Sequence, residues 1–267
     1  MDKRRHARKL ERPARLIMKL PCAALGFLTV LPLPGMCRHT EKDLIRSVPF
    51  FPLVGLLIGI SAAGIAFVLE GVFPPLVLAV LLVGWLAMVH GGLHLDGLAD
   101  TADGFLSPHG RERVLGIMRD SHIGAFGCLV IGGVLALKVA ALASLPDGYR
   151  MEAILLAPLA ARCIMVPMLD FLPPARSDGL GHLFFRHIYQ GEHRWLLVSE
   201  SIGAMIVLFG AAWILAGVVG LIAGTVAMAT TVLFAWWCWR RIGGRTGDTV
   251  GAASEFAEML VLVVFSV

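Results

Sequence analysis

The sequence predicts an all-α protein, a polytopic membrane bundle of about seven transmembrane helices with an N-terminal re-entrant or interfacial segment. Two observations carry this prediction. Of the 267 residues, 57% are hydrophobic and only 16% are charged, whereas soluble domains usually carry about 25% charged residues. The apolar residues also form long blocks, and about 20 apolar residues in a helix are enough to cross a bilayer.

Seven apolar blocks provide the predicted spans. Prolines lie inside or at the ends of several blocks, which membrane helices tolerate because their neighbours re-satisfy the freed carbonyl groups. The spans are expected at about residues 48–69, 73–90, 123–143, 151–172, 196–216, 219–239 and 249–267.

The segment 16–34 is apolar but contains Lys19 and three prolines. If this segment does not cross the membrane, all but three of the 23 Lys and Arg residues lie on one side. If it crosses, the basic residues divide between the two sides. Because short cytoplasmic segments are enriched in Lys and Arg, we expect 16–34 to be re-entrant or interfacial. The N-terminus and every long loop are then cytoplasmic.

Basic residues crowd the first nineteen positions, which we interpret as a cytoplasmic tail (1–19) before one membrane-embedded catalytic domain (20–267). The chain has no basic stripe with stacking aromatics, which argues against nucleic-acid binding. Anionic membrane lipids are a plausible partner for the tail. The five cysteines include no CxxC pair, which favours buried apolar side chains over a zinc site or disulfides. The sequence does not specify an oligomeric state.

The most informative stretch runs from His90 to Phe105. Asp96, Asp100 and Asp103 stand at i, i+4 and i+7, which places them within an arc of about 60° on an α-helix. Three carboxylates on one face repel each other unless a cation bridges them, and oxygen ligands select hard cations such as Mg²⁺. A solvated acidic face is the alternative, but the gaps hold Gly, Leu, Ala and Thr instead of further charges. The pattern therefore predicts a Mg²⁺ site.

Further charged residues lie where other spans meet the same face. Arg119, Arg162 and Arg245 are candidates for phosphate binding, because guanidinium groups pair with phosphate oxygens. Arg162 lies inside a span and fits a structural ion pair equally well. Arg240 and Arg241 fit a positive-inside anchor better than a substrate contact.

Acidic residues and one histidine near other spans extend the candidate site. Asp120 and His122, which precede the third span, are candidates for substrate binding. Asp248 and Glu255 are seven residues apart and so nearly share a helical face. We expect these two carboxylates to complete the metal site or to orient a substrate.

His90 and His94 stand one helical turn apart, which suits a transition-metal pair. Without an HExxH motif a zinc protease is disfavoured. On an unbroken helix the two histidines would face away from the aspartates, but Gly91-Gly92 interrupts that helix. A substrate or phosphate contact and a structural hydrogen bond therefore both stay open. His94 is also a candidate general base, as is Asp103.

The run from His94 to Gly104, HLDGLADTADG, resembles the signature of the cobalamin-5′-phosphate synthase family, also called adenosylcobinamide-GDP ribazoletransferases. Other similar segments keep the family's order, so the resemblance covers most of the chain from about residue 20. The basic extension 1–19 departs from the family pattern. The similar segments are residues 27–34, 49–55, 119–127, 161–162 and 244–252 with Glu255.

The resemblance implies a Mg²⁺-dependent transferase of the bacterial cytoplasmic (inner) membrane. It would join adenosylcobinamide-GDP to α-ribazole or its 5′-phosphate and release GMP, late in cobalamin (vitamin B12) biosynthesis. On this interpretation Asp96, Asp100 and Asp103 bind metal at a catalytic site facing the cytoplasm. The candidate arginines then bind the pyrophosphate or the leaving GMP.

Two other functions stay open. CDP-alcohol phosphotransferases also combine aspartates with Mg²⁺, but their Asp-Gly-x-x-Ala-Arg pattern has Ala and Arg where this chain has Asp100 and Thr101. A cation- or proton-coupled transporter would use Lys138, Arg162 and Asp170 as a relay. Transporters, however, usually place their site near the midplane between repeated halves, and this sequence shows no internal repeat.

Overall fold

The computed structural model describes residues 13–33, 40–177, 184 and 194–267, and what we predicted for 1–12, 34–39, 178–183 and 185–193 lies outside the described residues. Within the described ranges the regular secondary structure is helical. The elements are α2 (Pro13–Leu28), α3 (Glu41–Ile45), η2 (Val48–Phe50), α4 (Phe51–Leu69), α5 (Pro75–Val89), α6 (Leu93–Phe105), α7 (Arg111–Ile117), α8 (Ala125–Ala143), α9 (Arg150–Phe171), α11 (Arg194–Ile242) and α12 (Gly247–Phe265).

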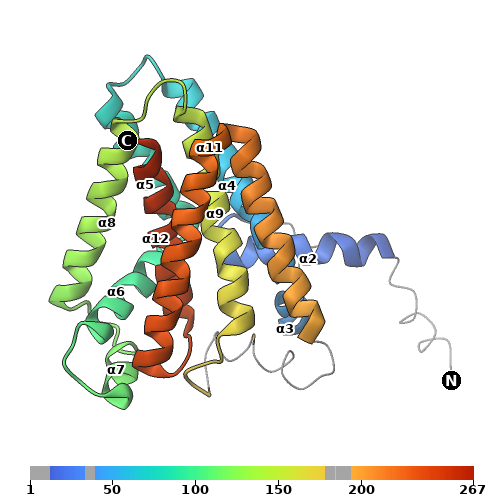
Figure 1. Ribbon diagram of the computed structural model, residues 1–267, viewed down its shortest axis with the longest axis vertical. Coiled ribbons are helices and arrows are strands. Elements are labelled where there is room, and N and C mark those ends of the chain that lie inside the picture. The colour runs from blue at the N-terminus through green and yellow to red at the C-terminus, as the bar shows by residue number, and fades with distance from the viewer. Residues whose placement is uncertain (1–12, 34–39, 178–183, 185–193) are drawn as a thin grey trace.

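Each predicted span coincides with a helical segment of the structure (Figure 1). Within the described ranges, four helices are long and apolar enough to cross a membrane alone, and α5 with α6, bent by 88°, would add a fifth span. The predicted spans 196–216 and 219–239 are the two halves of α11, which break at Ala216 and Gly217. The all-α membrane fold is confirmed, and the number of crossings stays a prediction.

The segment predicted to be re-entrant or interfacial contains α2, which lies across the long helices in Figure 1. This helix begins at Pro13 and so spans the predicted domain boundary between residues 19 and 20. Beyond its end, the backbone N–H of Val30 donates to the carbonyl of Val89 at 2.9 Å. The chain after α2 is therefore attached to the end of α5, just before α6 begins.

The loops that follow α6, α9 and α11 meet at one end of the bundle, which we call the aspartate end. Arg241, in the last turn of α11, donates to the carbonyls of Ser107 and His109 in the loop after α6. Arg111 donates to the carbonyl of Ala175, in the loop after α9, at 3.2 Å. The predicted one-sided arrangement of these basic loops is thus present, while their cytoplasmic location stays a prediction.

The helix α12 carries two carboxylates into the centre of the bundle, where it packs against α6, α8, α9 and α11. Lys138 of α8 donates to Glu255 at 2.6 Å and to Glu258 at 2.8 Å. Arg162 of α9 donates to the other oxygen of Glu258 at 3.0 Å. These four side chains are at most 3% exposed. Two cations therefore balance two carboxylates within an apolar interior.

Removing one member of this network leaves an uncompensated buried charge, which costs about 3–5 kcal/mol. We predict that Arg162→Met and Glu258→Met each lower the thermal stability of the purified protein in detergent. The double variant should recover most of the loss, because Lys138 and Glu255 still balance each other. Losses that simply add in the double variant would contradict the ion pair.

Candidate functional site

The helix α6 begins after a sharp bend at Gly91 and Gly92. Both glycines have positive φ, +62° and +74°, in the left-handed region where other residues incur about 1–2 kcal/mol each. An added side chain at Gly91 would also lie 2.6 Å from Val30 Cγ1. The bend turns α6 by 88° relative to α5, and α6 then packs on α12.

The backbones of α6 and α12 meet at Gly97. A Cβ atom at this position would lie 2.8 Å from both the Cα atom and the carbonyl oxygen of Asp248, so only glycine permits this approach. Thr246 caps α12, because its hydroxyl accepts from the backbone N–H of Thr249 at 3.2 Å and donates to Asp248 at 3.1 Å. The contact places a carboxylate from the far end of the sequence beside the aspartates of α6.

The carboxylate of Asp100 interacts electrostatically with Asp248, Asp96 and Asp103 and with the guanidinium of Arg176. Asp96 is exposed, whereas Asp100 and Asp248 are partly buried. The Nη2 atom of Arg176 lies 3.7 Å from Asp248 Oδ2. With every carboxylate ionised, Asp96, Asp100 and Asp248 together with this one guanidinium carry a formal charge of −2, which one divalent cation would neutralise. The oxygen-only donor set fits Mg²⁺.

Asp103 points to the start of α8. Its two carboxylate oxygens accept backbone hydrogen bonds from Gly124 at 2.7 Å and Gly127 at 2.9 Å. An added side chain at either glycine would collide with this carboxylate. A negative charge at a helix N-terminus is favourable, so Asp103 joins α6 to α8. The remaining lone pairs of the carboxylate leave room for a cation, and its metal and general-base roles stay predictions.

His90, His94 and Glu255 form a second group of possible metal ligands, with ligand atoms within 4.8 Å of one another. His90 Nε2 lies 3.4 Å from Glu255 Oε1, and the two histidine rings stack with centroids 4.4 Å apart. Two histidines and a glutamate are a zinc-type ligand set. Lys138 already donates to Glu255, however, and a divalent ion would add two charges to a buried network that is already balanced. We therefore interpret this group as structural.

This interpretation bears on three predicted site residues. Glu255 lies seven residues, or about 10 Å along a helix, beyond Asp248 on α12, and so deeper in the bundle than the aspartates. His94 is 2% exposed, and its Nδ1 lies 3.5 Å from the Ser254 hydroxyl. The metal role of Glu255, the catalytic role of His94 and the phosphate contact of His90 stay predictions.

The three predicted phosphate-binding arginines lie in different places. Arg162 is buried and paired with Glu258. Arg245 is 1% exposed, and its Nε and Nη2 atoms donate to the carbonyl of Leu169, near the end of α9, at 3.2 and 3.0 Å. Arg119 is exposed between α7 and α8. The structure therefore does not bring these three guanidinium groups together.

Asp120 and His122 form an exposed pair in the loop before α8. The Nδ1 atom of His122 lies 2.6 Å from Asp120 Oδ1, and the backbone N–H of His122 donates to the same oxygen at 3.1 Å. The side-chain hydrogen bond with Asp120 raises the pKa of His122 and lowers the pKa of Asp120. The imidazole thus stays protonated to higher pH than an isolated histidine, which suits a contact with an anion.

Sequence reasoning missed Arg176. The residue follows Pro173-Pro174, which end α9 and lead the chain out at the aspartate end. Its position in a predicted basic loop was the available signal. The positive-inside rule already explained that loop, so nothing singled out this guanidinium.

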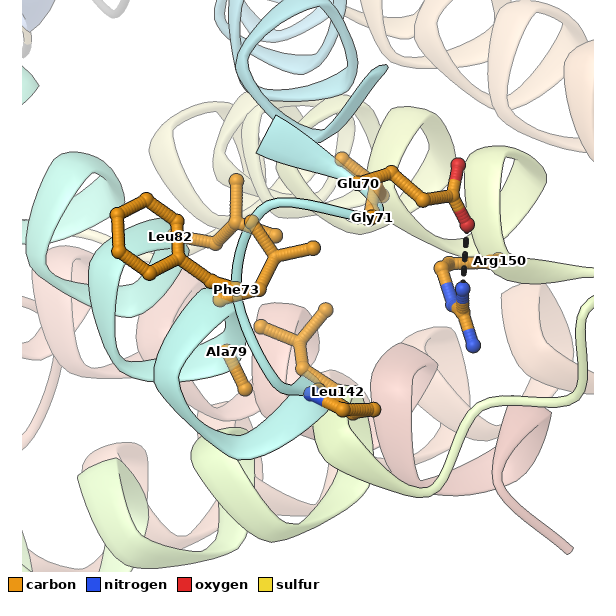
Figure 2. Close-up of a pocket in the computed structure, with 10 residues that line it drawn as sticks. Glu70, Gly71, Phe73, Ala79, Leu82, Leu142 and Arg150 are labelled. Atoms are coloured by element: carbon orange, nitrogen blue, oxygen red, sulfur yellow. Dashed lines mark hydrogen bonds and ion pairs between the residues drawn. The ribbon is translucent and has the colours of Figure 1, made fainter. Parts of the chain in front are cut away.

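A cavity of about 260 Å³ lies at the opposite end of the bundle, where α9 begins (Figure 2). Its walls are mainly apolar and include Phe73, Leu82 and Leu142. An ion pair between Glu70 and Arg150 lies at its edge. None of the residues around this cavity belongs to the aspartate end, so it is not the candidate site.

Comparisons with known proteins agree on one family. A protein named adenosylcobinamide-GDP ribazoletransferase from Roseiflexus sp. (strain RS-1) is 41% identical over 244 residues, covering 91% of this chain and 87% of that protein. The protein of the same name from Geotalea daltonii is 40% identical over 249 residues, covering 92% and 96%. The one from Syntrophobacter fumaroxidans is 41% identical over 242 residues, covering 90% and 94%.

No solved structure matches the chain. Residues 21–266 match the family described as cobalamin-5-phosphate synthase, which confirms the resemblance seen in the aspartate motif. With this match and relatives that align over nine-tenths of its length, the chain belongs to the cobalamin-5-phosphate synthase family.

Proposed function

We propose that the chain is an adenosylcobinamide-GDP ribazoletransferase. It joins adenosylcobinamide-GDP to α-ribazole or its 5′-phosphate and releases GMP, a late step of cobalamin biosynthesis. Relatives with this name align over most of the chain. The structural observation that carries the proposal is the meeting of Asp96, Asp100 and Asp248 with Arg176 at one end of a membrane bundle. Carboxylates for a divalent cation beside a guanidinium suit a pyrophosphate substrate.

The reaction asks for little covalent chemistry from the protein. The 3′-hydroxyl oxygen of α-ribazole forms a bond to the phosphorus attached to cobinamide. The bond from this phosphorus to the bridging oxygen breaks, GMP leaves with that oxygen, and the hydroxyl proton passes to a base. Catalysis of phosphoryl transfer rests mainly on positioning and on stabilising charge.

Mg²⁺ is the cofactor that we expect, held by Asp96, Asp100 and Asp248. Asp103 and Glu255 are the other predicted ligands. When bound, the ion would neutralise part of the charge on the pyrophosphate oxygens. The chain itself holds its carboxylates in place through the Gly97 contact and the cap of α12.

We further propose that the protein lies in the bacterial cytoplasmic membrane with its aspartate end in the cytoplasm. The apolar helices support the membrane location. The basic loops at the aspartate end support the orientation, since Lys and Arg concentrate on the cytoplasmic side.

A turnover assay tests the proposal directly. Purified protein in nanodiscs should convert adenosylcobinamide-GDP and α-ribazole 5′-phosphate into a cobalamin product and GMP, and EDTA should abolish the conversion. Asp100→Asn should lower kcat by at least about 100-fold, the usual loss when one group that stabilises transition-state charge is removed. Absence of product from folded wild-type protein would refute the activity. Full activity of Asp100→Asn would refute only its role at the metal.

The Gly97 contact provides a second prediction. Gly97→Ala should push α6 away from Asp248 at an overpacking cost of about 1–3 kcal/mol and should reduce turnover at saturating substrate. Gly84→Ala is the matched control, because a Cβ atom there meets nothing within 4 Å. Equal activities for the two variants would show that the site does not depend on this approach of the helices.

A further inference from the structure

Hydrogen bonds from two other parts of the chain hold the segment that leads to Arg176. The backbone N–H of Ala175 donates to the carbonyl of Arg245 at 2.8 Å, and the N–H of Arg245 donates to the carbonyl of Pro173 at 2.8 Å. Arg111 donates to the carbonyl of Ala175 from another direction. The chain just before Arg176 is therefore fixed to the segment that leads into α12.

Gly244 allows this attachment. A Cβ atom at Gly244 would collide with the carbonyl of Pro173, so a larger residue would separate the two segments. Because α12 begins only a few residues later, the base of the Arg176 side chain keeps a constant position relative to Asp248. Fixed attachment is what a group needs if it has to meet a substrate in one orientation.

The Arg176 side chain is largely buried and lies beside the carboxylate of Asp248. Its Nη2 atom lies 3.7 Å from Asp248 Oδ2, and the two side chains are 15% and 28% exposed. Hydrogen bonds between charged groups are usually about 2.7–2.9 Å long, so this ion pair is not a tight one. A closer contact with phosphate oxygens can therefore replace this long ion pair with Asp248.

The other arginines near this end are less suited to a substrate. Arg245 is buried against a helix-end carbonyl, and Arg241 donates to the loop after α6. Arg162 is buried in the ion-pair network. Arg176, by contrast, has a salt bridge to the aspartate cluster.

We propose that Arg176 binds the pyrophosphate of the donor substrate. This role rests on the proposed function. In the protein without substrate, Arg176 partly balances the negative charge of Asp248. When a divalent cation neutralises the aspartates, the guanidinium turns to the phosphate oxygens, which its planar fork can bind at two positions. The ligand that this arrangement suits is therefore an anion with two adjacent phosphate oxygens, held against the N-terminus of α12.

Steady-state kinetics with each substrate varied separately test this assignment. Arg176→Ala should lower kcat/KM for adenosylcobinamide-GDP by about 100-fold, the equivalent of two charge-assisted hydrogen bonds. The KM for α-ribazole 5′-phosphate should stay within about twofold. The kcat/KM of Arg176→Lys for adenosylcobinamide-GDP should fall between those of the wild type and Arg176→Ala, because lysine keeps the positive charge but lacks the planar guanidinium. Arg240→Ala, which removes an arginine packed over Trp236 at the same end, is the matched control and should resemble wild type.

Two further measurements separate binding from a structural effect. Guanidinium chloride at concentrations below those that unfold the protein should restore part of the Arg176→Ala activity and none of the Asp100→Asn activity. Equilibrium dialysis of adenosylcobinamide-GDP with Mg²⁺ and without acceptor should show weaker binding to Arg176→Ala.

The outcomes separate the two proposals. Wild-type donor affinity in Arg176→Ala, or equal losses for both substrates without rescue, would overturn the role of Arg176 while the transferase activity stood. Failure of the wild-type protein to form product would instead overturn the proposed function.

Discussion

The two carboxylates that α12 carries into the bundle constrain everything around them. Glu255 and Glu258 lie in an apolar interior, where an unpaired charge costs several kcal/mol, and a whole domain is stable by only about 5–15 kcal/mol. Lys138 on α8 and Arg162 on α9 must therefore both reach α12. Three helices are thus held together by charge balance as well as by apolar packing, and α12 can take only one depth and rotation.

The position of α12 determines where the candidate site forms. With its carboxylates buried between α8 and α9, its N-terminus comes to the aspartate end and Asp248 faces α6. The bend at Gly91 and Gly92 and the missing side chain of Gly97 then allow α6 to approach Asp248. The complete carboxylate cluster depends on tertiary packing between elements that are far apart in the sequence, because an isolated α6 would lack Asp248.

The sequence was enough to predict the long apolar helices, because each apolar block is long and bounded by polar or turn residues. It also predicted the break in α11 and the shared face of the aspartates of α6. It could not predict that Asp103 would accept the backbone hydrogen bonds of α8, since that depends on Gly124 and Gly127 approaching closely. Arg176 was missed for a related reason: its importance comes from the position of Asp248, and no local pattern encodes the distance between them.

Charge balance separates the two ionisable clusters of this protein. Ionisable groups at membrane depth are often functional, and the sequence made Arg162 and Glu255 candidates for phosphate and metal binding. In the structure their cluster contains two cations and two carboxylates and is nearly inaccessible to solvent, so its charge is balanced without a ligand. Asp96, Asp100 and Asp248 outnumber the single guanidinium beside them and are at least partly accessible. The excess negative charge there favours a bound cation, which is why we place the proposed sites for a cation and an anionic substrate together at the aspartate end.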